Sequence, residues 1–425
     1  MMNFFKRLSA GGVNGFKGGI KDSIKVGFED FRLGLRDATT VVKPTRSRMM
    51  EYDQPLLWAV LLLVTLGLVM VYSASIALPD GPKYAKYSSS HFLIRHAIAM
   101  VIAFGAGILA FKVPLRVWDK LAPAIFILAF ILLIIVLIPG VGKGVNGARR
   151  WIPLGIMNFQ SSELMKFAVV LFAAWYTVQR QDYLHHLVKG LAPMGAAVIA
   201  VGILLLLQPD MGAFMVIAMI AMGLLFLGGI SGKLFGALVG LAVGSFATII
   251  ILSPFRRERI FAYLDPWDTE FAAGKAYQLT HSLMAFGRGE WFGVGLGGSV
   301  EKLHYLPEAH TDFILAVIGE ELGFVGVTVV IGIFYWIVRR AFLIGRTALQ
   351  LDRSFAGLVA KGIAIWIGWQ AFINMGVNLG ILPTKGLTLP FVSFGGSGLL
   401  MNAIAIAVLL KVDFENRVMM RGGKV

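Results

Sequence analysis

Long apolar runs separated by short polar connections dominate the chain. Five runs reach or approach the roughly 18–20 apolar residues that cross a bilayer as a helix, namely 55–78, 121–138, 211–230, 234–253 and 313–338. Five weaker runs have the same character, namely 96–111, 164–178, 191–207, 362–382 and 389–410. A backbone in lipid must satisfy its own hydrogen bonds, which favours helices. The pattern predicts an all-α polytopic membrane protein with about ten transmembrane helices, forming one domain over residues 55–410.

The charge distribution predicts the orientation of these helices. The chain has 57% hydrophobic and 15% charged residues and a net charge of +15. With ten helices and a cytoplasmic N-terminus, 25 of the 39 Lys and Arg residues fall in segments on the cytoplasmic side. This excess follows the positive-inside rule. The basicity therefore predicts that both termini are cytoplasmic, and it does not indicate a nucleic-acid partner.

The two ends of the chain differ from the apolar middle. Residues 1–54 lack the continuous apolar core of a signal peptide. Their apolar side chains recur at near-helical spacing between basic ones, which predicts an amphipathic helix on the cytoplasmic face; four glycines favour the alternative of a disordered tail. Residues 411–425 are predicted to be a cytoplasmic tail. Cysteine is absent, which excludes disulfides and thiol chemistry.

One connection is long, and it is predicted to be extracytoplasmic. Residues 254–312 join helices 7 and 8 and can fold as a small cap, so chemistry is expected there. The glycine-rich run 293–299 follows no strand and precedes no acidic ribose-binding residue, unlike a dinucleotide-binding fingerprint. The chain also has no Walker A sequence, so nucleotide hydrolysis is not indicated.

Asp312 is the most informative polar residue. It ends the polar loop immediately before the apolar run that begins at Phe313. One interpretation is a helix cap, since Asp commonly accepts the first free N–H groups of a helix. The other is a carboxylate that takes a proton at the membrane edge, because acids within or beside membrane segments are often functional. Glu320 lies about 12 Å deeper in the same helix and is interpreted as a packing or gating acid.

Other outer segments also carry polar residues. Glu163 and Lys166 are three residues apart, so they share a helical face and can pair, and a membrane pair of this kind is expected to point inward. The outer segments bring several cations and few acids to one rim. Such a rim suits an anionic lipid-linked substrate, because Arg and Lys pair strongly with phosphate oxygens. One carboxylate that deprotonates an acceptor hydroxyl, with cations for a leaving diphosphate, would suffice for transfer of a sugar.

Several of these segments resemble the SEDS family (shape, elongation, division, sporulation). The resemblance runs from about Tyr52 to Arg417 and is carried by LPEAHTDF at 306–313, PTKGLTLP at 383–390, ARRWI at 148–152 and QPDMG at 208–212. The segments 70–75 and 284–290 and the basic N-terminus are more similar to the division member than to the elongation member. The family's helix-starting Pro is Ser161 here. Ser can still cap a helix, so only a small change in helix entry is expected.

The resemblance implies a peptidoglycan glycosyltransferase that polymerises lipid II at the division septum. It implies transfer with inversion, undecaprenyl diphosphate as leaving group and Asp312 as general base. The family's membrane Glu–Lys pair matches Glu163 and Lys166, which are interpreted as a structural pair in an inner cavity. The implied partners are a class B penicillin-binding protein transpeptidase and other membrane proteins of the division machinery.

The substrate contacts are predicted from residue type and position. They are Arg149, Arg150, Arg259, Lys385, His310 and Ser393; for the cations, the alternative is anchoring to lipid headgroups. A divalent cation, Mg²⁺ or Mn²⁺, is compatible with a diphosphate, but no ligand cluster in the sequence specifies a metal site. Two other functions stay open: a flippase or transporter of lipid-linked precursors, and a non-enzymatic division scaffold.

Overall fold

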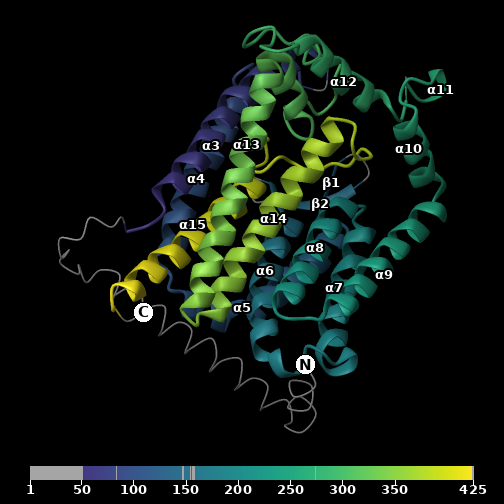
Figure 1. The fold of residues 1–425 in the computed structure, drawn as a ribbon. Helices are drawn as coiled ribbons and strands as arrows, with labels where there is room; N and C mark the ends of the chain where they lie inside the picture. Colours follow the sequence, from purple (N-terminus) through teal and green to yellow (C-terminus); the bar gives the residue numbers. More distant parts are fainter. Residues whose placement is uncertain are drawn as a thin grey trace.

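The protein is a bundle of long helices (Figure 1). A computed structural model describes residues 51–423 except 83, 146, 147, 154, 156, 157 and 273. The long helices of this part are α3 (Gln54–Ser75), α4 (His91–Lys112), α5 (Leu115–Leu137), α6 (Ser161–Gln179), α7 (Ala192–Leu207), α8 (Met211–Leu227), α9 (Gly232–Ile251), α13 (Ile314–Gln350), α14 (Ser354–Asn378) and α15 (Gly396–Met420). The predicted all-α polytopic fold is confirmed. The predicted N-terminal amphipathic helix lies outside the described residues.

Each of the ten predicted spans corresponds to one of these helices. Among the described residues, eight helices are long and apolar enough to cross a membrane. The other two are α6 and α8, which pack against each other and against α14. Most side chains of α6 and many of α8 are buried. A helix in the middle of the bundle touches protein instead of lipid, so it can be shorter or more polar than its neighbours.

The helix ends differ most from the expected ones in α13 and α15. Helix α13 runs on to Gln350, well beyond residue 338. Helix α15 begins at Gly396, after an irregular segment, and it continues through the first ten residues of the predicted tail. These ten residues carry charge, but Glu415 and Asn416 are buried and accept hydrogen bonds from Arg353. Partnered polar side chains let the helix continue where hydropathy alone indicated its end.

A small sheet precedes α6, in a segment expected to be a loop. Its strands are β1 (Lys143–Val145), β2 (Ala148–Pro153) and β3 (Asn158–Gln160), antiparallel and in the order β1-β2-β3. Trp151 of β2 pairs with Gln160 of β3. The sheet thereby brings β2 beside the start of α6.

Short helices fill the longer connections. Between α9 and α13 lie α10 (Pro254–Leu264), α11 (Thr269–Ala272) and α12 (Tyr277–Gly289), at the upper right and top of Figure 1. Helix α12 packs on α13. The remaining short helices are Leu78–Asp80, Gln181–Tyr183 and Leu187–Leu191. The C-terminal end of α15 lies at the opposite end of the bundle from α12 (Figure 1).

Candidate active site

A polar cavity of about 380 Å³ lies at one end of the bundle. Its wall comes from the N-terminal parts of α4, α6, α8 and α15, from β2 and β3, and from the segments that lead into α13 and α15. Since these helices all begin at the cavity, it lies at the same end of the bundle as residues 254–312. Its charged lining residues are Arg95, Arg150, Glu163, Asp210, Glu308 and Asp312. The wall is therefore richer in acids than the sequence indicated.

Asp312 is held in place through its main chain. Its carbonyl oxygen accepts hydrogen bonds from Asn374 Nδ2 at 2.8 Å and from Asn378 Nδ2 at 2.9 Å. Both amides belong to α14, where a spacing of four residues puts them on one face. Asn378 Oδ1 also accepts from Ala316 N in the first turn of α13. Because α14 binds the main chain of Asp312, the carboxyl group of this residue is free to face the cavity.

The helix-cap interpretation of Asp312 is wrong. Helix α13 begins at Ile314, its N-cap residue is Phe313, and no side chain caps it. The carbonyl oxygen of Glu308 instead accepts from the N–H groups of Thr311, Asp312 and Phe313 at 3.1–3.2 Å. Glu308 has φ +57°, in the left-handed region that few non-glycine residues adopt. This tight turn satisfies the backbone in front of the helix without the Asp312 side chain.

The surroundings of Asp312 favour its protonated form. Burial raises the pKa of this carboxyl group to about 7, and the negative charges of Glu308 and Asp210 act in the same direction, against the attraction of Arg150. A carboxylate that titrates near neutral pH is a stronger base than an ordinary one and is still partly ionised at that pH. The group is chemically suited to take a proton from a hydroxyl.

Gly386 leaves room for the carboxyl group. A Cβ atom at this position would lie 2.9 Å from Asp312 Oδ2, closer than van der Waals contact allows. Asn374 Nδ2 donates to the carbonyl oxygen of Leu387 at 2.5 Å as well as to that of Asp312. One amide therefore ties the two segments together and fixes the distance between Gly386 and Asp312.

Glu163 and Lys166 lie together in the structure. Lys166 Nζ donates to Glu163 Oε1 at 2.8 Å and to Gln370 Oε1 at 2.6 Å. Lys166 is fully buried, and Gln370 also accepts from Trp366 Nε1 and donates to the carbonyl oxygen of Thr388. Glu163 lines the cavity, and its Oε2 accepts no hydrogen bond from the described residues. The pair links α6 to α14 and leaves one acidic oxygen at the cavity wall.

Arg150 and Asp210 organise another part of the cavity wall. Arg150 Nε donates to the carbonyl oxygen of Gln208 at 3.1 Å, and its Nη2 donates to that of Pro209. Asp210 caps α8 by accepting from Ala213 N, and it also accepts from Ser162 Oγ at 3.0 Å. The expectation that Ser161 caps α6 is wrong. Its hydroxyl makes no hydrogen bond to the described residues, and the neighbouring Ser162 bonds Asp210 instead.

The predicted substrate-binding residues lie in different places. Arg150 lines the cavity, whereas Arg149, Arg259, Lys385, His310 and Ser393 do not. Arg149 is exposed, and Arg259 belongs to α10. His310 is buried, and its ring packs against Phe92 and Phe394 at 4.9 and 5.6 Å between centroids. Ser393 Oγ accepts from Leu389 N and so closes the turn before α15.

Sequence reasoning did not select several residues that shape the site. Asn374, Asn378 and Gln370 hold it from α14, and Arg95 lines it from α4. The available signal was amide side chains at four-residue spacing inside an apolar run. In the described part of the chain, no group of three or more His, Cys, Asp or Glu side chains is arranged to hold a metal ion.

Comparisons with known proteins identify the family of the chain. Residues 54–418 match the cell cycle protein family of FtsW, RodA and SpoVE. A chain named "Probable peptidoglycan glycosyltransferase FtsW" from Polynucleobacter necessarius is 73% identical over 399 residues, or 94% of each chain. A chain of the same name from Burkholderia thailandensis is 69% identical over 392 residues, covering 92% of this chain and 85% of that one.

Solved structures share the fold. A chain from a structure described as "Structural coordination of polymerization and crosslinking by a peptidoglycan synthase complex" has a TM-score of 0.70 at 29% identity, covering 87% of this chain and 99% of that chain. The rod shape determining protein RodA of Thermus thermophilus has a TM-score of 0.61 at 27% identity, covering 88% and 99%. The chain belongs to the FtsW, RodA and SpoVE family of multi-pass membrane proteins, within the SEDS group.

Proposed function

We propose that this chain is a peptidoglycan glycosyltransferase that polymerises lipid II at the extracytoplasmic side of the bacterial inner membrane. The observation that carries the proposal is the carboxyl group of Asp312, which faces a polar cavity at one end of the bundle with its pKa raised to about 7. The names of relatives up to 73% identical support the same activity.

Asp312 acts as the general base. Its carboxylate takes the proton of the 4-hydroxyl of the acceptor GlcNAc as that oxygen attacks C1 of the donor's muramyl sugar. The new C–O bond forms while the bond from C1 to the phosphate oxygen breaks, so the configuration at C1 is inverted. Undecaprenyl diphosphate leaves with the bonding electrons. Its two phosphates spread the charge, so the leaving group needs no proton and one carboxylate suffices.

Cationic side chains stabilise the departing diphosphate. Arg150 and Arg95 are the guanidinium groups of the cavity wall, and guanidinium pairs with phosphate through two parallel hydrogen bonds. Arg149, Arg259 and Lys385 lie outside the cavity lining and stay predictions for contacts along the approach to it. His310 and Ser393 shape the wall through packing and turn formation.

A polymerase explains this geometry better than a flippase does. A transporter needs a site near the membrane midplane that opens to either side. The cavity is instead built from helix starts at one end of the bundle, and a sugar already activated through diphosphate can react there without ATP.

The proposal includes a partner and a location. We place the enzyme at the division septum, with cytoplasmic termini, beside a class B penicillin-binding protein that cross-links the new strands and beside other division proteins. Support comes from the structural similarity to a chain of a peptidoglycan synthase complex and from the FtsW names of the relatives.

The test is polymerisation of labelled lipid II by purified protein, with and without the cognate penicillin-binding protein. We expect Asp312→Asn to lower the rate by about 10²–10⁴-fold, the usual contribution of a general base. The fold should survive, because α14 binds the main-chain carbonyl and not the carboxyl group. The matched control is Asp268→Asn, the same chemical change in an exposed loop, which should keep the wild-type rate.

The outcomes separate the candidate functions. Polymer from the wild type that is lost in Asp312→Asn and kept in Asp268→Asn supports the enzyme and its base. A wild-type rate from Asp312→Asn would mean that Asp312 is not the general base. No polymer from the wild type with its partner present would contradict the proposal, and movement of lipid II across liposome membranes would then identify a flippase.

A further inference from the structure

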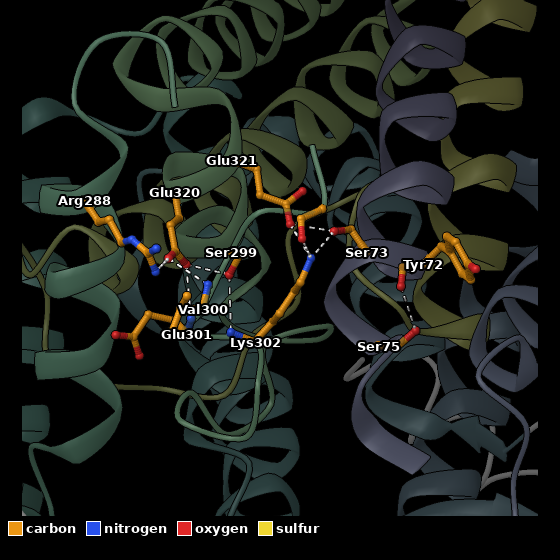
Figure 2. Close-up of polar contacts among 11 residues, drawn as sticks. Tyr72, Ser73, Ser75, Arg288, Ser299, Val300, Glu301, Lys302, Glu320 and Glu321 are labelled. Atoms are coloured by element: carbon orange, nitrogen blue, oxygen red, sulfur yellow. Dashed lines mark hydrogen bonds and ion pairs between the residues drawn. The ribbon is translucent and has the colours of Figure 1, made fainter. Parts of the chain in front are cut away.

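A second group of buried charges lies outside the cavity, between the extracytoplasmic segment and α13 (Figure 2). Lys302 Nζ donates to Glu321 Oε1 at 2.7 Å, to Ser73 Oγ at 2.9 Å and to the carbonyl oxygen of Gly297 at 2.8 Å. The side chains of Lys302 and Glu321 are 3% and 0% exposed. All three donor hydrogens of the ammonium group are therefore used, by α3, by the loop and by α13.

Glu320 binds the loop beside this pair. Its Oε1 accepts from Val300 N at 2.9 Å and from Arg288 Nη1 at 3.1 Å. Its Oε2 accepts from Ser299 Oγ at 2.5 Å and from Glu301 N at 3.3 Å. The carboxylate thus receives four hydrogen bonds, all from residues 288–301, as Figure 2 shows.

A break in α13 adds main-chain contacts to the same loop. Gly323 has φ +67° and ψ −166°, which interrupts the helix. The carbonyl oxygens of Glu320 and Glu321 accept instead from Val294 N at 2.9 Å and Gly295 N at 3.1 Å. A Cβ atom at Gly323 would lie 2.4 Å from the nitrogen of Gly293, so only glycine lets the two backbones approach this closely.

These contacts close a loop around Asp312. Asp312 lies two residues before α13, while Glu320 and Glu321 lie about two turns into that helix. The segment 303–312 is therefore attached to α13 at both ends. Its start is held by the contact between Lys302 and Glu321, and its end leads directly into the first turn of the helix. A loop with both ends fixed has few conformations left, and its last residue is the proposed base.

We propose that Lys302 and Glu321 are positioning residues that hold the loop 303–312 so that the carboxyl group of Asp312 faces the cavity beside Gly386. The expected effect on the reaction rate rests on the proposed glycosyltransferase function. The expected effect on the order of loop 303–312 does not depend on that function. Neither residue lines the cavity, so both act through the loop.

The energetics favour a geometric role over a purely stabilising one. Burial removes both ions from water, and this desolvation offsets much of their attraction, so apolar pairs of similar volume are often as stable. An ammonium group with three fixed acceptors, in contrast, allows only one arrangement of α3, loop and α13. A misplacement of about 1 Å in an active site can cost about 10²-fold in rate.

The test compares two double variants in which both ions of a pair are neutralised, so that no unpaired charge is left buried. The first is Lys302→Met with Glu321→Gln. The control is Arg353→Met with Glu415→Gln, a pair at the other end of the bundle whose side chains are 13% and 2% exposed. For each, the rate is measured against lipid II concentration and pH, and hydrogen exchange is measured in peptides that cover 303–312.

We expect the Lys302/Glu321 variant to lose about 10–100-fold in kcat, with KM changed less than 3-fold. Its pH midpoint should move to lower pH, because a released carboxyl group gains water and loses the burial that raises its pKa, while Glu308, Asp210 and Arg150 still face the group. Amides of 303–312 should exchange at least 10-fold faster. The Arg353/Glu415 control should change none of these three quantities.

Two results would overturn the inference. One is a folded Lys302/Glu321 variant with wild-type kcat and pH midpoint. The other is a loss of activity with an unchanged pH midpoint and unchanged exchange of 303–312, as expected from lower stability alone. If the wild type itself makes no polymer, the proposed function fails, and the exchange measurement alone decides whether this pair holds the loop.

Discussion

At the scale of single residues, the charges around Asp312 predict a pH dependence. The proposed base must be ionised, and its pKa is raised to about 7, so the polymerisation rate should rise with pH through about 7. Glu308 is the charged neighbour that raises this pKa most. Glu308→Gln removes a negative charge, so the pKa of Asp312 should fall and the midpoint of the pH–rate profile should move to lower pH.

The profile is measured with saturating lipid II, which reports the enzyme–substrate complex. The side chain of Gln keeps an oxygen that can accept from Thr311 Oγ1, as Glu308 does at 2.9 Å, so the turn should persist. A midpoint that stays in place or rises in Glu308→Gln would contradict the assignment of the titrating group to Asp312.

Gly386 gives a second prediction at this scale. In Gly386→Ala the new methyl carbon would lie 2.9 Å from Asp312 Oδ2, and the carboxyl group is the mobile partner that must turn away. We expect a rate loss of about 10-fold or more with Tm nearly unchanged, because a displaced catalytic group affects turnover more than stability. Gly144→Ala is a suitable control, because its Cβ would meet only Arg149 Cγ at an ordinary 3.7 Å.

Single residues were predictable from the sequence where position alone carried the signal. Asp312 and the Glu163–Lys166 pair are charges at the edge of apolar runs, which makes them conspicuous. Asn374 and Asn378 were not selected, because an amide in a span has several common roles and only the fold shows that these two grip the carbonyl of Asp312. His310 and Ser393 have residue types that suit a site, but their side chains point into packing and a turn.

At the scale of elements, α14 is the scaffold on which the site is assembled. Asn374→Leu would leave the buried carbonyl oxygen of Leu387 without this donor and would weaken the hold on Asp312. Each unsatisfied buried group costs about 1–3 kcal/mol. We therefore expect Asn374→Leu to lower Tm by several degrees and to reduce polymerisation more than the loss of folded protein explains.

The comparison variant is Thr248→Val on α9, a helix with no buried residues. Among the described residues, its hydroxyl donates to the carbonyl oxygen of Gly244 in its own helix, so Tm and rate should stay at wild-type values. Thermal unfolding and polymer yield measure both variants. Equal effects from the two substitutions would mean that the hydrogen bonds from Asn374 to the main chain are not needed for activity.

The long helices were predictable where the length of an apolar run specified them. All ten spans follow from hydropathy, since a bilayer imposes both length and composition. The ends of the helices do not follow from hydropathy. At the end of α15, for example, charged residues continue the helix because Arg353 and its partners stabilise them. The sheet β1–β3 is short and polar, and its pairing depends on contacts that no local pattern encodes.

At the scale of the whole molecule, the direction of the bundle in the membrane is the feature on which the proposed chemistry depends. The cavity lies at the end where α4, α6, α8 and α15 begin. The end of α13 and the loop to α14 lie at the opposite end, with five Lys and Arg residues between 339 and 361. Lys and Arg favour the cytoplasmic side, so the cavity should face outward, where lipid II is polymerised.

The absence of cysteine makes this orientation directly measurable, because any introduced thiol is the only one in the chain. Asp268→Cys lies in the exposed loop after α10, and Gln350→Cys lies at the exposed end of α13. A membrane-impermeant maleimide added to intact spheroplasts should label the first variant and leave the second unlabelled until the membrane is opened. Labelling of Gln350→Cys from outside, with protection of Asp268→Cys, would mean that the protein has the opposite orientation in the membrane. The cavity would then face the cytoplasm, and Asp312 could not meet an acceptor strand outside the cell.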